Sequence, residues 1–265
     1  MSRIRQGFTV GPGMNVVESL RWAEEAGFAF VELLLDGRFA RERLAECGAV
    51  AAIAGAVADS PLGLVCHLPF ALDIGSPFTP VREGSVAELL ACLDLAGEIG
   101  AEKAIFHPSS RAWDLGWSDE DLEPLILDSV REVTAGAREQ GIEPCVENVI
   151  NGPYSIEGFE ELLSATDAAM TFDTSHARLA GFSAIESAAF LDRHHEHVSH
   201  VHLSDNRGTG DEHLPVGLGT IDFETVLAPF LDGEWSGTMT HEVGTTNRAY
   251  IETSKRELDG LIRSY

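Results

Sequence analysis

The chain has 265 residues, 44% of them hydrophobic, so it can bury one large core without needing a second domain. No stretch approaches the roughly 20 apolar residues of a membrane span, and the N-terminal residues lack a signal-peptide core, so we expect a cytoplasmic protein without a membrane partner. The formal net charge of −25 disfavours nucleic acid, because phosphate binding usually leaves a basic stripe.

The acidic residues are spread along the chain, and only two of the 18 basic residues, Lys103 and Lys255, are lysines. This balance resembles that of proteins from salt-loving archaea, in which a hydrated acidic surface maintains solubility. Charge of this kind bears on solubility and non-specific binding rather than on fold. We therefore interpret it as halophilic adaptation rather than as the mark of a cationic partner.

Apolar runs alternate with helix-like segments from one end of the chain to the other. Strands are expected at residues 7–13, 28–35, 62–67, 101–107, 142–147, 168–173, 197–203 and 237–243. Helices are expected at 15–27 with Asn15 as its cap, at 38–59, from the Pro77–Pro80 loop to Gly100, and at 118–141, where Ser118 and Asp121 form a capping box.

The apolar runs are continuous, as expected for parallel strands that are buried on both faces. Eight strand–helix units predict an α/β fold: a single (β/α)8 TIM barrel forming one domain over residues 1–265. An open, doubly wound sheet is the alternative, but it would not need potential ligands at six successive strand ends.

The six strand ends carry residues that can bind metal. They are His67, His107, Glu147, Asp173, His202 and Glu242. In a parallel barrel these ends lie together on the C-terminal face, where such enzymes build their active sites.

Four of these residues form an oxygen-rich set: Glu147, Asp173, His202 and Glu242. Three carboxylates and an imidazole suit Mn²⁺, Zn²⁺, Mg²⁺ or Co²⁺, and the absence of thiolate argues against a structural zinc site. Without a cation, the crowded carboxylates would raise one another's pKa values. The alternative for each residue alone is a capped or salt-bridged strand end.

Five further candidates can bind metal or substrate: His67, His107, His176, Asp211 and His213. If all nine residues are ligands, the site holds two or three ions and suits in-line attack on a phosphate. If only four are ligands, it holds one ion, and the histidines are free to contact a polar substrate. Otherwise these are hydrogen-bonded loop residues.

The segments HLPF, FHPSS, VENV, FDTSHA, HVHLSDN, DEHLPVGLGTIDF and HEV together resemble the xylose-isomerase-like barrel superfamily, also called AP endonuclease family 2. It contains sugar isomerases, epimerases and the endonuclease IV type of abasic-site nuclease. The resemblance runs from the second predicted strand to the eighth.

The isomerase and epimerase branch implies one divalent ion on the four-residue set, with Glu147 and Glu242 also exchanging protons with the sugar carbon. His176 would then hold substrate oxygens, and Arg207 would contact substrate. Trp113 either stacks on a sugar ring or has a structural role in covering the end of the barrel.

The nuclease branch implies three zinc ions. They would be held by His67, His107 and Glu147; by Glu147, Asp173, His202 and Glu242; and by His176, Asp211 and His213. Two departures count against it. The segment after the second strand has Arg38 as its only basic residue, and Phe70 stands where a tyrosine is expected. Glu32 instead matches the VEL signature of the sugar-active branch.

We therefore expect a metal-dependent sugar or sugar-phosphate isomerase or epimerase with a small sugar-like substrate. Abasic-site cleavage in DNA by a trinuclear zinc centre is the alternative, and a non-catalytic metal- or sugar-binding barrel is the third. One ion is expected on the first hypothesis and three on the second. Related barrels often pair, so a homo-oligomer is compatible with the sequence.

Other histidines and the cysteines are expected to be structural. His200 should be a packed core residue, His241 should point towards the helices, and His194, His195 and His197 should face solvent. Without a CxxC pair, the cysteines should be buried free thiols in a reducing compartment; they are Cys47, Cys66, Cys92 and Cys145.

Overall fold

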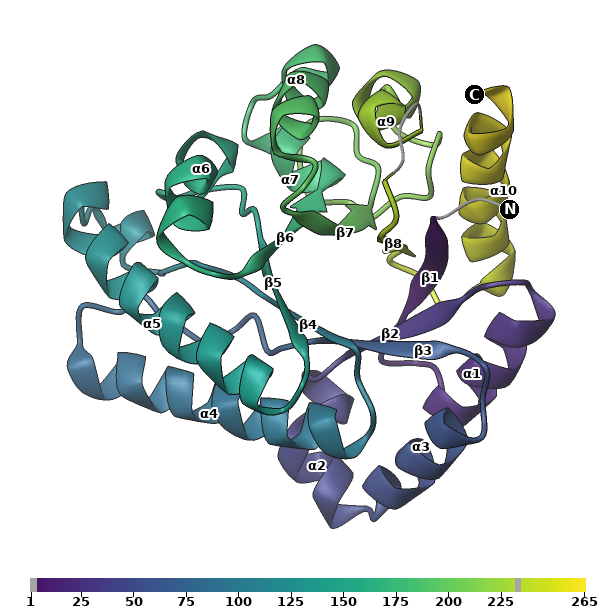
Figure 1. Ribbon diagram of the computed structural model, residues 1–265, viewed down its shortest axis with the longest axis horizontal. Coiled ribbons are helices and arrows are strands. Elements are labelled where there is room, and N and C mark those ends of the chain that lie inside the picture. Colours follow the sequence, from purple (N-terminus) through teal and green to yellow (C-terminus); the bar gives the residue numbers. More distant parts are fainter. Residues whose placement is uncertain (1–3, 232–234) are drawn as a thin grey trace.

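Eight parallel strands close into a barrel in the computed structural model, which describes residues 4–231 and 235–265 (Figure 1). The strands are β1 Arg5–Val10, β2 Phe30–Leu34, β3 Gly63–His67, β4 Lys103–Phe106, β5 Glu143–Glu147, β6 Ala169–Asp173, β7 Val198–Leu203 and β8 Thr238–His241. Each strand pairs with its neighbours in chain order, and β8 pairs with β1. The predicted TIM barrel is confirmed.

Helices surround the barrel (Figure 1). They are α1 Val16–Glu25, η1 Gly37–Phe39, α2 Arg41–Glu46, α3 Ala49–Ala58, α4 Thr79–Glu98, η2 Trp113–Leu115, α5 Asp119–Glu139, α6 Ile156–Ala165, α7 Thr174–Leu179, α8 Ala184–His194, α9 Phe223–Leu231 and α10 Arg248–Ser264. Both predicted caps are confirmed: the Asn15 side chain accepts from the Glu18 N–H, and Ser118 and Asp121 form a reciprocal capping box. No helix among these residues is long and apolar enough to span a membrane.

Two predicted elements differ most from the structure, while others shift by one or two residues, such as β4, which ends at Phe106, and β8, which ends at His241. The helix expected over 38–59 is divided into η1, α2 and α3. Ala40, with a ψ of 140°, separates η1 from α2, and Gly48, with a left-handed φ of 67°, separates α2 from α3. The first strand ends at Val10 rather than at residue 13. Pro12 lacks an N–H for the ladder, and the chain turns at Gly11, whose carbonyl accepts from the Met14 N–H.

Side chains fill the lower part of the barrel interior. Phe30, Val65, Ile105 and Cys145 form a fully buried cluster inside the ring of strands. Gly7 makes room for it, since a Cβ there would lie 2.4 Å from the Phe30 ring. The barrel is therefore packed rather than hollow, and the space for a ligand lies above this layer, at the C-terminal ends of the strands.

The histidines expected to be structural mostly lie as predicted. His241 points towards α10, with Nδ1 2.9 Å from Ser254 Oγ, and His200 is fully buried. His195 and His197 are exposed, but the solvent-facing prediction is wrong for His194. Its ring packs on Phe190 with the centroids 4.6 Å apart, because it still belongs to the last turn of α8.

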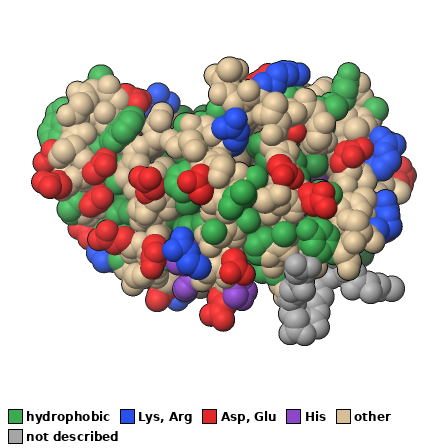
Figure 2. All heavy atoms as spheres, turned by 90° about the horizontal axis from the view of Figure 1, so that it is seen from above, with side chains coloured by type: hydrophobic (Ala, Val, Ile, Leu, Met, Phe, Trp, Pro, Cys, Tyr) green, Lys and Arg blue, Asp and Glu red, His purple; other side chains and the backbone are tan. Residues whose placement is uncertain are grey.

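The cysteine prediction needs one correction. Cys66, Cys92 and Cys145 are buried free thiols, whereas Cys47 is exposed. It follows α2 directly, at the break that the continuous-helix prediction missed. On the face drawn in Figure 2, acidic side chains are scattered rather than gathered into one patch.

Candidate metal centre

The nine candidate ligands meet at the C-terminal mouth of the barrel. Six of them lie at the C-terminal ends of β3 to β8, with His107 and Glu242 one residue beyond β4 and β8; α7 supplies His176, and the loop after β7 supplies Asp211 and His213. A cavity of about 120 Å³ opens among them. Its wall also includes Leu34 and Phe70. Asp173 and His202 are fully buried beside it.

Glu147 is the hub of the cluster. Its Oε2 lies 3.2 Å from His67 Nε2 and 3.1 Å from His107 Nε2. Its Oε1 lies 3.0 Å from His202 Nδ1 and 3.4 Å from His176 Nδ1. Burial opposes ionisation of Glu147, but the charges of His202 and His107 outweigh burial and lower its pKa well below the usual value. The hub is therefore a carboxylate at neutral pH.

Three carboxylates surround one nitrogen of His202. Nδ1 lies 3.0 Å from Glu147 Oε1, 3.5 Å from Glu242 Oε2 and 3.7 Å from Asp173 Oδ2. A carboxylate and a neutral imidazole nitrogen are both acceptors, so this arrangement needs positive charge at its centre. In the absence of a metal, that charge is a proton. Burial opposes protonation of His202, but the charges of Glu147 and Glu32 outweigh burial and raise its pKa well above the usual value.

Asp173 shows most directly that the carboxylates lack a partner. Burial raises the pKa of its carboxyl group to about 7, and the negative charges of Glu147 and Glu242 act in the same direction. Its Oδ1 caps α7 by accepting from the His176 N–H, whereas its buried Oδ2 has no hydrogen-bond partner among the described residues. A divalent cation would satisfy this oxygen and relieve the repulsion, so the residues present fit a metal ion.

Asp211 joins two histidines at the rim of the cavity. Its Oδ2 lies 2.9 Å from His213 Nε2 and 3.4 Å from His176 Nε2, while Ser175 Oγ donates to its Oδ1. His213 has a left-handed φ of 47°, which is uncommon outside glycine and raises the backbone energy. The loop therefore holds His213 in a strained conformation that aims it at Asp211.

Asp205 holds that loop in place through hydrogen bonds to its backbone. Its carboxylate accepts from the backbone N–H groups of Gly217, Gly219 and Ile221 at 2.7–3.1 Å. A Cβ at Gly219 would lie 2.3 Å from Asp205 Oδ1, so glycine is required for this close approach. The PVGLG segment thus has a structural role: it anchors the loop that carries Asp211 and His213.

The two predicted substrate contacts lie outside the residues that line the cavity. Arg207 is largely exposed and forms an ion pair with Glu212. Trp113 donates from Nε1 to Asp119 Oδ1 at 2.9 Å. Their roles in substrate binding stay predictions. Phe70 does line the cavity, with its ring centroid 6.2 Å from that of His107.

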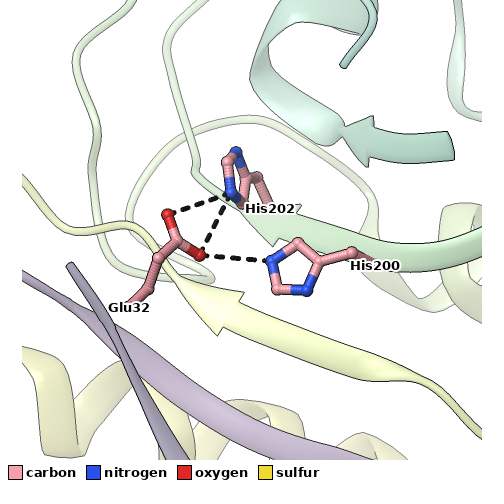
Figure 3. Close-up of side chains that lie close together, drawn as sticks. All are labelled: Glu32, His200 and His202. Atoms are coloured by element: carbon pink, nitrogen blue, oxygen red, sulfur yellow. Dashed lines mark hydrogen bonds and ion pairs between the residues drawn. The ribbon is translucent and has the colours of Figure 1, made fainter. Parts of the chain in front are cut away.

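A second polar layer lies beneath the metal-binding candidates, and the sequence reasoning missed it. Glu32 contacts both His200 and His202 inside the barrel (Figure 3). The sequence placed His200 and His202 on one face of a strand and singled out Glu32 in the VEL segment. It gave no signal that β2 and β7, which are not neighbours in the sheet, bring these side chains into contact.

The sequence profile of a family described as "Xylose isomerase-like TIM barrel" matches residues 20–263. An uncharacterized protein of Methanocaldococcus jannaschii is 30% identical over 191 residues, which cover 68% of this chain and 64% of that protein. The chain thus spans less than two thirds of that relative's length. A probable endonuclease 4 of Aquifex aeolicus is 26% identical over 211 residues, covering 72% of this chain and 71% of that protein.

Solved structures with the same fold come from proteins with different names. A D-tagatose 3-epimerase-like protein superposes with a TM-score of 0.79 at 23% identity, covering 98% of this chain and 97% of that one. A protein from Thermus thermophilus, soaked with zinc chloride, superposes with a TM-score of 0.72 at 28% identity, covering 96% of this chain and 97% of that one. The first likeness shows the fold alone.

Proposed function

The chain belongs to the xylose isomerase-like TIM barrel family, and from this premise we propose that it is a divalent-metal-dependent isomerase or epimerase. Its substrate would be a small sugar, a sugar phosphate or a related hydroxy-carbonyl compound. One observation carries the proposal: Glu147 and Glu242 both line a small cavity and converge on Nδ1 of the same buried histidine, His202. Two carboxylates at one centre can exchange a proton with a bound carbon acid.

The surroundings of the cavity favour a small polar substrate over a duplex. Leu34 and Phe70 supply apolar wall, and the histidines supply hydrogen-bonding groups. The first basic side chain after β2, Arg38, donates to the Pro12 carbonyl at 2.9 Å and lies over the Phe39 ring. Wedging into DNA needs inserted side chains and phosphate contacts to offset lost stacking. This segment offers few of either.

The residues that would hold the ion are Glu147, Asp173, His202 and Glu242, and the unpartnered Oδ2 of Asp173 supports that assignment. Manganese, zinc, magnesium and cobalt all accept such ligands. When bound, the ion would hold adjacent substrate oxygens and stabilise the negative charge that develops on them.

Proton transfer falls to the two glutamates. Glu147 or Glu242 would remove the proton from the carbon next to the carbonyl, and the other would return it to that carbon or its neighbour. The side chain of Glu242 is 19% exposed and that of Glu147 only 1%, so Glu242 is the more accessible from the cavity. His176, at the cavity wall, would hold substrate oxygens.

The test is the exchange of solvent deuterium into a panel of ketoses, aldoses and their phosphates in the presence of Mn²⁺ or Zn²⁺. The assay is run at low salt and at molar salt, because the composition of the chain is strongly acidic. We expect exchange and product with at least one sugar, both lost in Glu147→Gln while the circular dichroism spectrum is unchanged. Retained turnover in that variant contradicts the role of Glu147. Metal binding without exchange in any sugar favours a non-catalytic barrel.

Phosphodiester cleavage at abasic sites is the second candidate, because two further ligand groups are assembled here. His67 and His107 share one oxygen of Glu147, and His176 and His213 share one oxygen of Asp211. On this reading the wild type nicks an abasic-site duplex, and His107→Ala and Asp211→Ala do not. The assay needs low salt as well as high, since phosphate contacts weaken steeply with ionic strength.

A further inference from the structure

A chain of hydrogen bonds crosses the barrel interior below the candidate metal centre (Figure 3). His202 Nε2 lies 3.3 Å from both oxygens of Glu32. Glu32 Oε2 also accepts from the Thr240 hydroxyl at 2.6 Å and lies 3.2 Å from His200 Nε2. All four side chains are fully buried, so no bulk water competes for these groups.

The positions of the protons follow from which groups can donate. An ionised carboxylate only accepts, and the Thr240 hydroxyl and one nitrogen of each histidine converge on the Glu32 carboxylate. His202 Nε2 therefore carries a proton that it donates to Glu32. The single Thr240 proton also goes to Glu32, so the Thr240 oxygen accepts from His200 Nε2 at 3.1 Å.

The second nitrogen of His202 faces the opposite way (Figure 3). Nδ1 points among Glu147, Glu242 and Asp173 at the distances of 3.0, 3.5 and 3.7 Å given above. Once Nε2 is committed to Glu32, only Nδ1 can offer a lone pair to a cation between those carboxylates. A histidine ligand is commonly fixed in this manner by a carboxylate on its other nitrogen.

We propose that Glu32 is a positioning residue that fixes His202 in the Nε2–H tautomer and so aims Nδ1 at the metal. Thr240 and His200 hold Glu32 in place from below. This inference rests on the proposed metal site, but it concerns Glu32, a fully buried residue of the same cavity wall that contacts the nitrogen of His202 opposite the carboxylates.

The same three side chains, Glu32, His200 and His202, are close enough to hold a metal ion themselves. Glu32 Oε1 has no hydrogen-bond partner among the described residues, but the hydrogen bonds of the other groups argue against that role. The Thr240 hydroxyl donates its single proton to Glu32 Oε2, so the Thr240 oxygen accepts from His200, which places a proton on His200 Nε2. A metal here would have to displace protons from both histidines.

The first experiment compares Glu32→Gln with Glu143→Gln. Both replace a carboxylate by an amide on a barrel strand, but Glu143 lies at the opposite end of the barrel and faces solvent. We expect zinc affinity, measured by competition with a chromogenic chelator, to fall about 10–100-fold in Glu32→Gln and to stay unchanged in Glu143→Gln. Thr240→Val, which removes one donor to Glu32, should give a smaller loss.

The second experiment locates the proton in the wild type. The ¹⁵N-histidine spectrum of the zinc-loaded chain, assigned by difference with His202→Asn and His200→Asn, should show His202 protonated on Nε2. In Glu32→Gln the exchange of that proton with solvent should be faster. A packing role alone would leave this resonance in place.

Five outcomes are distinguished. Weaker zinc binding with the same number of ions, together with the Nε2 proton, supports the proposal. Unchanged affinity overturns it, and so does loss of one whole ion in Glu32→Gln, which would make Glu32 a ligand. A His202 protonated on Nδ1 in the zinc-loaded wild type overturns it even if Glu32→Gln fails to fold. A wild type that binds no zinc contradicts the proposed metal site instead.

Discussion

The two ends of the barrel treat buried charge in opposite ways. At the N-terminal end, Lys103 is buried with its ammonium group paired: it donates to the Ser199 carbonyl at 2.7 Å and to the Ser199 hydroxyl, and lies 3.2 Å from Glu143. At the C-terminal end, three carboxylates crowd around one histidine, and an oxygen of Asp173 has no hydrogen-bond partner among the described residues. Of these two ends, the mouth is the one where carboxylates crowd one another.

The requirements of stability explain the paired charge at the N-terminal end of the barrel but not the crowded carboxylates at the C-terminal mouth. A buried cation with two acceptors and a counter-charge is what folding requires of a polar group in the interior. Crowded carboxylates lower the stability of the chain by itself, and natural proteins keep such arrangements where function needs them. The contrast therefore favours the mouth as the place of a metal-binding function.

Substitutions at the two ends of β5 should differ most in their effect on turnover. Glu147→Gln should lower turnover by roughly 10²–10⁴-fold, because a placed carboxylate contributes about that much to proton transfer. Glu143→Gln, at the start of the same strand, should leave turnover unchanged and cost less than about 1 kcal/mol, since its pair with Lys103 is half-exposed. Steady-state kinetics and urea unfolding measure both; equal losses of turnover would remove the contrast.

Asp173→Asn should change stability and metal binding in opposite directions. The pKa of Asp173 is about 7 in the fold against a usual 3.8, so its contribution to metal-free stability falls as pH rises between those values. The asparagine keeps the α7 cap but not the charge. Without metal, the variant should melt a few degrees above the wild type at pH 8 and show a smaller difference at pH 4.

Zinc should then reverse that order. It should raise the melting temperature of the wild type through binding to the folded state and leave the variant almost unaffected. Thermal scans with EDTA and with excess zinc give the four values needed. A variant that is less stable without metal at pH 8, or that zinc stabilises as strongly as it does the wild type, would contradict the account of the mouth.

Lys103→Met should lower stability at the N-terminal end of the barrel without changing the metal centre. Methionine keeps most of the buried stem but removes the shorter of two hydrogen bonds to the Ser199 carbonyl, the other being from the Thr238 hydroxyl at 3.3 Å, and this should cost about 1 kcal/mol of unfolding free energy. Zinc affinity and KM should not change, because the pair lies at the other end of the barrel. Weakened zinc binding in a folded variant would show that the two ends are coupled.

Arg207→Ala should have the smallest effect if the exposed pair with Glu212 describes its role. Surface ion pairs contribute about 0–1 kcal/mol, so stability should barely fall. A rise in KM of tenfold or more, with the melting temperature unchanged, would instead support the substrate contact predicted from the sequence. Glu212→Gln, which breaks the same pair, is the matched control.

The strand-end residues could be predicted because parallel strands force their C-terminal ends to one face. Glu147 and Asp173 end their strands as expected, and Glu242 follows β8, where its backbone N–H still donates to the Leu203 carbonyl. The cap at Asn15 was equally readable, because it depends on neighbours in the chain.

Contacts across the barrel were not readable in this way. Glu32 and Thr240 meet at 2.6 Å although 208 positions separate them and their strands are not adjacent. Alternation on β2 and β8 gives the face of each side chain but not its depth along the barrel axis. The break at Gly48 was missed for another reason: the flanking alanines favour helix, and only the backbone angle reveals the turn.

The most direct test of the central claim is the metal content of the chain, measured by elemental analysis after purification without chelators and supply of Zn²⁺ and Mn²⁺. We expect close to one ion per wild-type chain and none in Asp173→Asn. No ion in the wild type would contradict a metal centre at the mouth. Close to three would contradict the single-ion isomerase and favour cleavage of a phosphodiester.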